Sequence, residues 1–158
     1  MPDEHHKKFL EGLESSKQAV WLVARWLVDH GYTVTIPPTS EAPEQKDWRE
    51  FADAGDLEVS GQRVEVKCLS AEFTGPDNWP FPDFIVCAKH AWDNADPKPY
   101  RICYLNKAMT HFAALDCLGT CDQWTSRIVA DSRFDGREQP TYVCNKNLPK
   151  YGKLTMRN

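Results

Sequence analysis

The stretch Asp56-Leu57-Glu58-Val59-Ser60-Gly61-Gln62-Arg63-Val64-Glu65-Val66-Lys67 decides the fold of this chain. Apolar and polar residues alternate on both sides of Ser60-Gly61, which predicts two strands joined by a two-residue turn. Such a turn fixes the register and opposes these pairs: Val59 and Gln62, Glu58 and Arg63, Leu57 and Val64, and Asp56 and Glu65. One face of the hairpin is then apolar and turned to a core, while the other carries the charged side chains.

The opposition of Asp56 to Glu65 needs an explanation, because like charges directly across two strands destabilise a sheet. A divalent cation held between the two carboxylates removes the conflict, and oxygen ligands of this kind suit Mg²⁺ or Mn²⁺. Lys67 lies two residues beyond Glu65 on the same face, where its ammonium group can hold a phosphate or an attacking water. The hairpin therefore predicts a divalent-metal site with a lysine beside it. A hairpin with one solvated charged face gives the same alternation, so the pattern alone leaves both interpretations open.

The remaining segments predict an α/β domain with a mixed central sheet. Residues 3–30 have apolar residues at helical spacing and end at Gly31, which suits a helix C-terminus. We expect strands at 32–36, 84–88 and 100–105, with 84–88 central in the sheet, and further strands within 127–130 and 141–145. A short helical turn is expected at 47–53, loops at 39–46 and 70–83, and a second helix at 108–118.

Length and composition fit one soluble domain spanning residues 1–158. No apolar run approaches the roughly 20 residues that cross a bilayer, and the charged N-terminus lacks the apolar core of a signal peptide. We therefore expect a cytoplasmic protein that does not contact a membrane. The chain has 6 cysteines, several of them in apolar segments, and they are expected to remain reduced.

The net charge and the charge distribution lead to opposite expectations about nucleic-acid binding. The net charge of −4 disfavours a phosphate-rich partner. Residues 144–158, however, contain no acid and predict a basic C-terminal tail, in which Lys146, Lys150 and Lys153 are candidate nucleic-acid contacts. Charge alone favours a solvated tail.

The segment 54–59 followed by Arg63-Val64-Glu65-Val66-Lys67 resembles the paired motif of the PD-(D/E)XK nuclease superfamily, in which an Asp begins one strand and Glu-x-Lys lies on the next. Gly31-Tyr32 after a long helix also looks like the opening of that family, and the resemblance covers residues 9–105. It implies an αβββαβ restriction-endonuclease-like core with a mixed sheet flanked by helices. It also implies a metal-dependent endodeoxyribonuclease, of a kind frequent in phages and mobile elements.

The same resemblance implies roles for individual residues. Asp56 and Glu65 would bind the metal together with the backbone carbonyl of Val66, and Lys67 would be the catalytic lysine. A further ligand from the first helix would be Glu14 or Gln18, and the sequence does not decide between them. DNA is the implied partner, and cutting both strands favours a homodimer. A catalytically silent nucleic-acid-binding module on the same fold is the alternative function.

Overall fold

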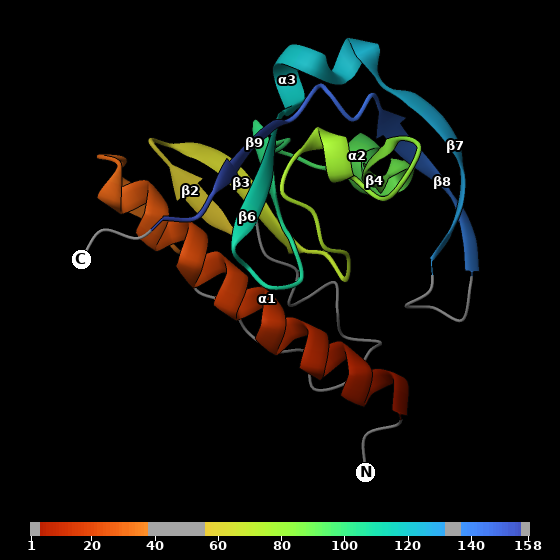
Figure 1. Cartoon of the computed structure of the whole chain (residues 1–158). Helices are drawn as coiled ribbons and strands as arrows, with labels where there is room; N and C mark the ends of the chain where they lie inside the picture. The colour runs from red at the N-terminus through yellow and green to blue at the C-terminus, as the bar shows by residue number, and fades with distance from the viewer. Residues whose placement is uncertain (1–3, 38–55, 132–136, 156–158) are drawn as a thin grey trace.

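The computed structural model describes residues 4–37, 56–131 and 137–155, and Figure 1 shows the arrangement of its elements. The predicted turn at 47–53 and loop at 39–46 lie outside these ranges. The helices are α1 (Glu4–Asp29), α2 (Lys89–Asn94) and α3 (Cys117–Thr120), with 3-10 turns at Pro76–Asn78 and Cys121–Gln123. The strands are β1 (Val34–Thr35), β2 (Leu57–Val59), β3 (Gln62–Cys68), β4 (Phe84–Ala88), β5 (Arg101–Leu105), β6 (His111–Asp116), β7 (Thr125–Asp131), β8 (Arg137–Cys144) and β9 (Lys150–Lys153).

The strands form two sheets. The larger sheet has the order β1-β2-β3-β5-β6-β9, and the smaller has the order β4-β8-β7. In the larger sheet β3 pairs with β5 in parallel, whereas its other ladders are antiparallel. The expected mixed sheet of an α/β domain is thereby confirmed.

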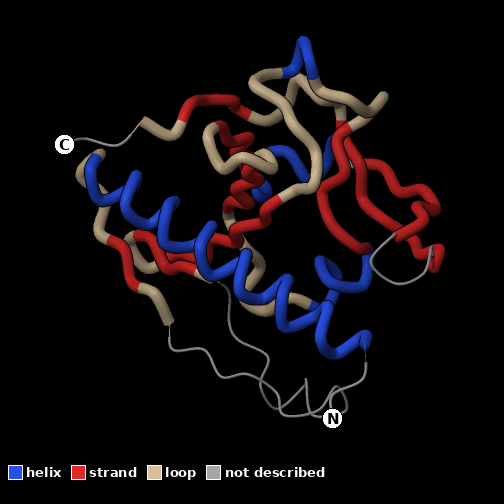
Figure 2. Tube along the Cα trace, turned by 60° about the horizontal axis from the view of Figure 1, so that its bottom comes forward, coloured by secondary structure: helices blue, strands red, loops and turns tan. Residues whose placement is uncertain are grey.

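The larger sheet is the middle layer of the described part of the chain. On β5, Ile102 and Tyr104 belong to a core shared with Phe84 and Val86 of the smaller sheet. Cys103, which points to the opposite face of β5, belongs to a second core built with α1. Figure 2 shows α1 crossing the larger sheet, with β7 and β8 set apart from this helix. The described part of the chain thus has three layers, which are α1, the larger sheet and the smaller sheet.

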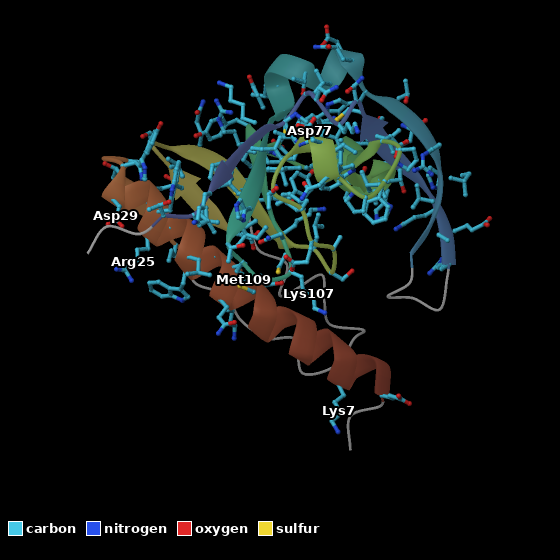
Figure 3. The ribbon with its side chains drawn as sticks, viewed as in Figure 1. Lys7, Arg25, Asp29, Asp77, Lys107 and Met109 are labelled. Atoms are coloured by element: carbon cyan, nitrogen blue, oxygen red, sulfur yellow. The ribbon has the colours of Figure 1, made fainter. Side chains whose placement is uncertain are left out.

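Helix α1 forms where the apolar spacing predicted it, and Gly31 follows it with φ of +89°. Val20 and Val23 are buried against the larger sheet. Phe9 and Leu13, which belong to the same predicted stripe, have side chains outside the described ones. In Figure 3, Met109 of the β5–β6 turn lies beside α1, and it packs against this second core. None of the described helices is long and apolar enough to cross a membrane.

The prediction of a helix at residues 108–118 is wrong over most of its length, because these residues form β6. Ala113 and Leu115 alternate with more exposed neighbours and are fully buried. Pairing with β5 on one side and β9 on the other supplies long-range hydrogen bonds that outweigh the local helix preference of Ala and Leu.

The placement of residues 84–88 also differs from the prediction. They do form a strand, but β4 is an edge strand of the smaller sheet. The smaller sheet covers the face of the larger sheet that faces away from α1, and Trp92 of α2 and Cys117 of α3 belong to the core on that side. A continuous apolar run signals burial without telling which sheet a strand joins.

All 6 cysteines are free thiols in the structure. The segment expected to be a basic tail is ordered over its described part. Cys144 ends β8, and Lys150 and Lys153 bound β9, which pairs with β6 at one edge of the larger sheet.

Candidate functional site

The β2–β3 hairpin has the predicted register. Ser60 and Gly61 both adopt positive φ, at +51° and +80°, as a tight hairpin turn requires. The ladder pairs Val59 with Gln62, Glu58 with Arg63 and Leu57 with Val64, all as predicted. The side chains expected to face a core are buried there: Leu57, Val59, Val64 and Val66. Glu65 and Lys67 consequently point to the other face of β3.

Asp56 lies immediately before β2 and contacts β3 through its side chain. Its carboxylate Oδ2 accepts a hydrogen bond of 2.8 Å from the backbone N–H of Val66. In a hairpin with this register, the N–H and the carbonyl of Val66 both point toward β2. Asp56 thus satisfies a strand donor with a carboxylate, and its side chain lies next to the Val66 main chain.

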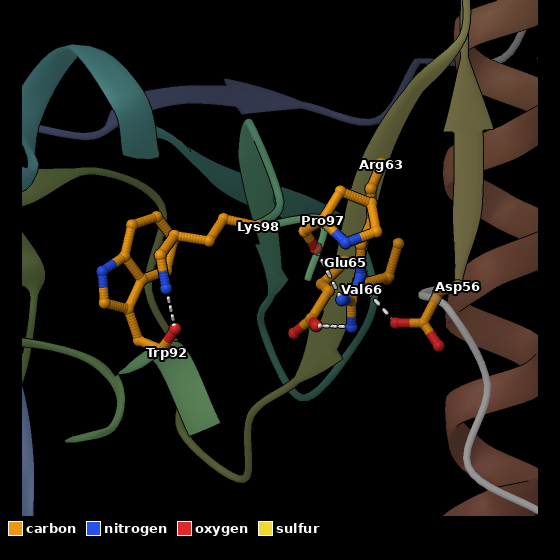
Figure 4. A network of polar contacts seen from close by, with 7 residues as sticks. All are labelled: Asp56, Arg63, Glu65, Val66, Trp92, Pro97 and Lys98. Atoms are coloured by element: carbon orange, nitrogen blue, oxygen red, sulfur yellow. Dashed lines mark hydrogen bonds and ion pairs between the residues drawn. The ribbon is translucent and has the colours of Figure 1, made fainter. Parts of the chain in front are cut away.

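Glu65 has a different partner. Its Oε1 accepts a hydrogen bond of 2.7 Å from Nη2 of Arg63, and the two side chains are 27% and 15% exposed. Figure 4 shows the two acidic side chains directed to separate partners, Glu65 to the guanidinium and Asp56 to the strand backbone. A guanidinium and an N–H group therefore offset part of the repulsion for which the sequence suggested a cation.

The ion pair of Arg63 with Glu65 was not predicted from the sequence. Arg63 was expected only as the cross-strand neighbour of Glu58. Arg63 lies two residues before Glu65 on one strand, and this spacing is the signal that could have identified the pair. Its Nη1 also donates to the carbonyl of Pro97 at 2.9 Å, while its buried Nε has no hydrogen-bond partner among the described residues. Arg63 thereby ties β3 to the segment that precedes β5 (Figure 4).

Lys67 is half-buried on the same face of β3 as Glu65. It forms no hydrogen bond or ion pair with any residue in the described ranges, so its ammonium is available to an anion. The charges of Lys67 and Glu65 both affect the pKa of the Cys87 thiol on β4. Burial raises the pKa of Cys87, the positive charge of Lys67 opposes this rise, and Glu65 adds to it. Lys67 therefore lies on the side of the larger sheet that faces β4.

The structure leaves the first-helix ligand undecided. Gln18 is exposed on α1 and makes no hydrogen bond within the described ranges. Glu14 belongs to α1, but its side chain lies outside the described ones. Neither residue is linked to Asp56 or Glu65 by a described contact.

The predicted nucleic-acid contacts are not brought to the hairpin. Lys150 and Lys153 lie on β9, and two strands, β5 and β6, separate β9 from β3 in the larger sheet. Lys146 precedes β9, and its carbonyl accepts a hydrogen bond from the hydroxyl of Tyr151.

The donor set of the hairpin can be compared with what a hard divalent cation needs. Two carboxylates and the Val66 carbonyl are oxygen ligands, which suit Mg²⁺ or Mn²⁺ when water and phosphate complete the coordination. To act as a ligand, Glu65 would have to release Arg63. Within the described ranges, no group of three or more His, Cys, Asp or Glu side chains is close enough to hold a metal. Water and substrate would therefore have to supply the remaining ligands of a cation held by these donors.

Comparisons with protein-family models, with curated proteins and with solved structures find no match to this chain.

Proposed function

We propose that this chain is a divalent-cation-dependent nuclease that hydrolyses phosphodiester bonds, with DNA as its substrate. The observation that carries the proposal is the 2.8 Å hydrogen bond between Asp56 and the Val66 N–H. It holds an acidic side chain against the main chain of a Glu-x-Lys strand, which is the arrangement that the resemblance to PD-(D/E)XK nucleases implies.

The topology gives further support. A long helix is followed by three antiparallel strands, and β5 then returns parallel to β3 after a crossover that includes α2. This order resembles the αβββαβ order of a restriction-endonuclease-like core. In this chain the crossover also includes β4, which joins the smaller sheet.

Asp56, Glu65 and the carbonyl of Val66 would hold Mg²⁺ or Mn²⁺, with Glu14 or Gln18 as a further ligand. When bound, the cation lowers the pKa of a water ligand and neutralises charge on the phosphate. Lys67 would donate to the phosphate or to the attacking water, and its positive charge stabilises the charge that develops in the transition state. Arg63 pairs with Glu65 in the structure, and a bound cation would have to take its place.

A catalytically silent nucleic-acid-binding module is the second candidate function. The observation in its favour is the ion pair between Arg63 and Glu65, which already engages one of the two proposed acidic ligands. Such a module would bind DNA but would not cut it.

Plasmid cleavage distinguishes the two functions. Supercoiled plasmid is incubated with the protein in Mg²⁺, Mn²⁺ or EDTA, and with the variants Glu65→Gln and Lys67→Met. Glu58→Gln is the matched control, because Glu58 is an exposed acid on the same hairpin. We expect nicking or linearisation that EDTA abolishes and that both site variants reduce by about a hundredfold or more, while the control retains it.

Cleavage that survives both site variants would exclude the proposed site. An electrophoretic mobility shift with a labelled duplex in Ca²⁺ separates the remaining outcomes. A shift without cleavage in Mg²⁺ or Mn²⁺ supports the silent module, and the absence of both a shift and cleavage argues against either function.

A further inference from the structure

A cavity of about 480 Å³ opens between the C-terminal part of α1 and the larger sheet. Its volume is within the roughly 300–1,000 Å³ of small-molecule sites. The cavity lies on the α1 side of the sheet, because Val59, Val64 and Cys103 both line it and belong to the core under α1. Glu65 and Lys67 point to the opposite face, so the cavity is separate from the proposed nuclease site.

The wall of this cavity is mostly apolar. Trp26 and Leu27 of α1 form one side, and Phe112 of β6 forms another, with its ring 5.1 Å from that of Trp26 in an edge-on arrangement. Ala114 and Cys103 form part of the floor. Burial raises the pKa of Cys103 to about 12, so its thiol is neutral at physiological pH. The interior is therefore suited to an uncharged, flat or branched hydrocarbon body.

Two cations accompany this apolar wall. Arg101 lies two residues before Cys103 on β5 and so shares its face, while Lys150 lies opposite Ala114 on β9. Neither cation forms an ion pair or hydrogen bond with a residue in the described ranges. No acidic residue is among the described residues that line the cavity. Asp116 is paired with Arg101 across the ladder, but its carboxylate accepts a hydrogen bond from the N–H of Gly119.

We propose that this cavity binds a small organic anion, a molecule with a flat apolar body and a single carboxylate, sulfonate or phosphate group. The body would pack against the apolar wall that Trp26, Leu27 and Phe112 form, and the anionic group would pair with Arg101 and Lys150. Charge complementarity decides the class of ligand, because two cations that form no ion pair with a described residue, beside an apolar wall, favour an anion over a neutral or cationic molecule. The proposal does not depend on nuclease activity.

Two fluorescent probes of matched shape test this proposal. Anilinonaphthalene sulfonate has the flat body and one negative charge, and phenylnaphthylamine has the same body without the charge. Titration of the full chain with each probe, together with a crystal structure of the sulfonate complex, gives stoichiometry, affinity and location. We expect one sulfonate per chain in the cavity, and a lower affinity for the uncharged probe by about three- to tenfold.

Variants give the matched controls. Arg101→Met combined with Lys150→Met should weaken sulfonate binding by about three- to tenfold and leave the uncharged probe unaffected. Lys153→Met removes a cation from the same strand but from outside the cavity lining, and should leave both affinities within about twofold. Ala114→Trp should block the cavity to both probes, with circular dichroism confirming the fold.

Equal affinities of the two probes, or sulfonate binding that is unchanged in the variant lacking Arg101 and Lys150, would overturn the proposal. These outcomes remain decisive even where Ala114→Trp fails to fold. Probe molecules located elsewhere in the crystal structure would overturn it as well.

Discussion

The carboxylate of Asp56 and the backbone N–H of Val66 are joined by a 2.8 Å hydrogen bond, although ten positions separate the two residues in the chain. Because β2 begins only at Leu57, this bond takes the place of a further ladder contact between β2 and β3. Asp56 consequently has two proposed roles, as an acceptor for the strand and as an acidic ligand for a cation. The two roles can be separated by substitution.

Asp56→Asn and Asp56→Ala should differ in stability. The amide oxygen of Asn can still accept the Val66 N–H, whereas Ala leaves this donor unsatisfied at a buried strand residue. We expect Asp56→Ala to lower the free energy of unfolding by about 1–2 kcal/mol and Asp56→Asn by less than half of that. Urea unfolding measures both values. If Asp56→Asn lowers the free energy of unfolding as much as Asp56→Ala does, the negative charge of Asp56 rather than its acceptor oxygen stabilises the hairpin.

The ion pair between Arg63 and Glu65 should be measurable in a double-mutant cycle. Arg63→Met and Glu65→Gln, alone and combined, isolate the coupling free energy between the two side chains. We expect about 0.5–1 kcal/mol, because both side chains are partly exposed and water screens the pair. Urea unfolding at low and high salt checks the value, and a coupling near zero at low salt would show that the pair does not stabilise the hairpin.

Gly152→Ala should destabilise the edge of the larger sheet. A Cβ at Gly152 would lie 2.6 Å from Cζ of Phe112 on the neighbouring strand, so the ring must move. We expect a loss of about 1–2 kcal/mol, measured by thermal or urea unfolding. Phe112→Leu in the same chain should recover part of this loss.

The matched control for this substitution is Gly75→Ala. A Cβ at Gly75 would meet no atom within 4 Å, and its backbone is extended with φ of −173°. This control should change stability by less than about 0.5 kcal/mol. A similar loss at both glycines would show that backbone freedom, and not the contact with Phe112, causes the effect.

Acid should weaken the contribution of the ion pair between Asp83 and Arg127. Both carboxylate oxygens of Asp83 accept hydrogen bonds from the Arg127 guanidinium at 2.8 Å. These hydrogen bonds hold the pKa of Asp83 below its usual value. A carboxyl group with a lowered folded-state pKa contributes stability above its unfolded pKa of about 4, and this contribution is lost as pH falls through the folded value.

Arg127→Met tests this pH dependence. The stability difference between the wild type and Arg127→Met should be constant from pH 7 to about pH 5 and should shrink below about pH 4. Urea unfolding across this range measures the difference. A difference that grows toward acid pH would contradict the assignment.

The sequence was most informative where local chemistry decides structure. The turn at Ser60-Gly61 fixed the register of β2 and β3 because positive φ at both positions closes a two-residue hairpin. The apolar spacing likewise predicted α1. By contrast, residues 111–116 contain Ala and Leu, which also suit a helix, and only pairing with β5 and β9 makes them a strand.

The candidate site divides in the same way. Alternation along β3 by itself determined that Glu65 and Lys67 share a face and that Val64 and Val66 are buried on the other. Only the tertiary structure decided that Asp56 bonds the main chain of β3, that Arg63 neutralises Glu65, and that β9 places Lys150 beside the cavity under α1. The physical reason is the sequence separation of the residues that interact. Strand alternation and turn geometry depend on neighbouring residues, whereas a side chain's partner depends on which distant segments the sheet brings within hydrogen-bonding distance.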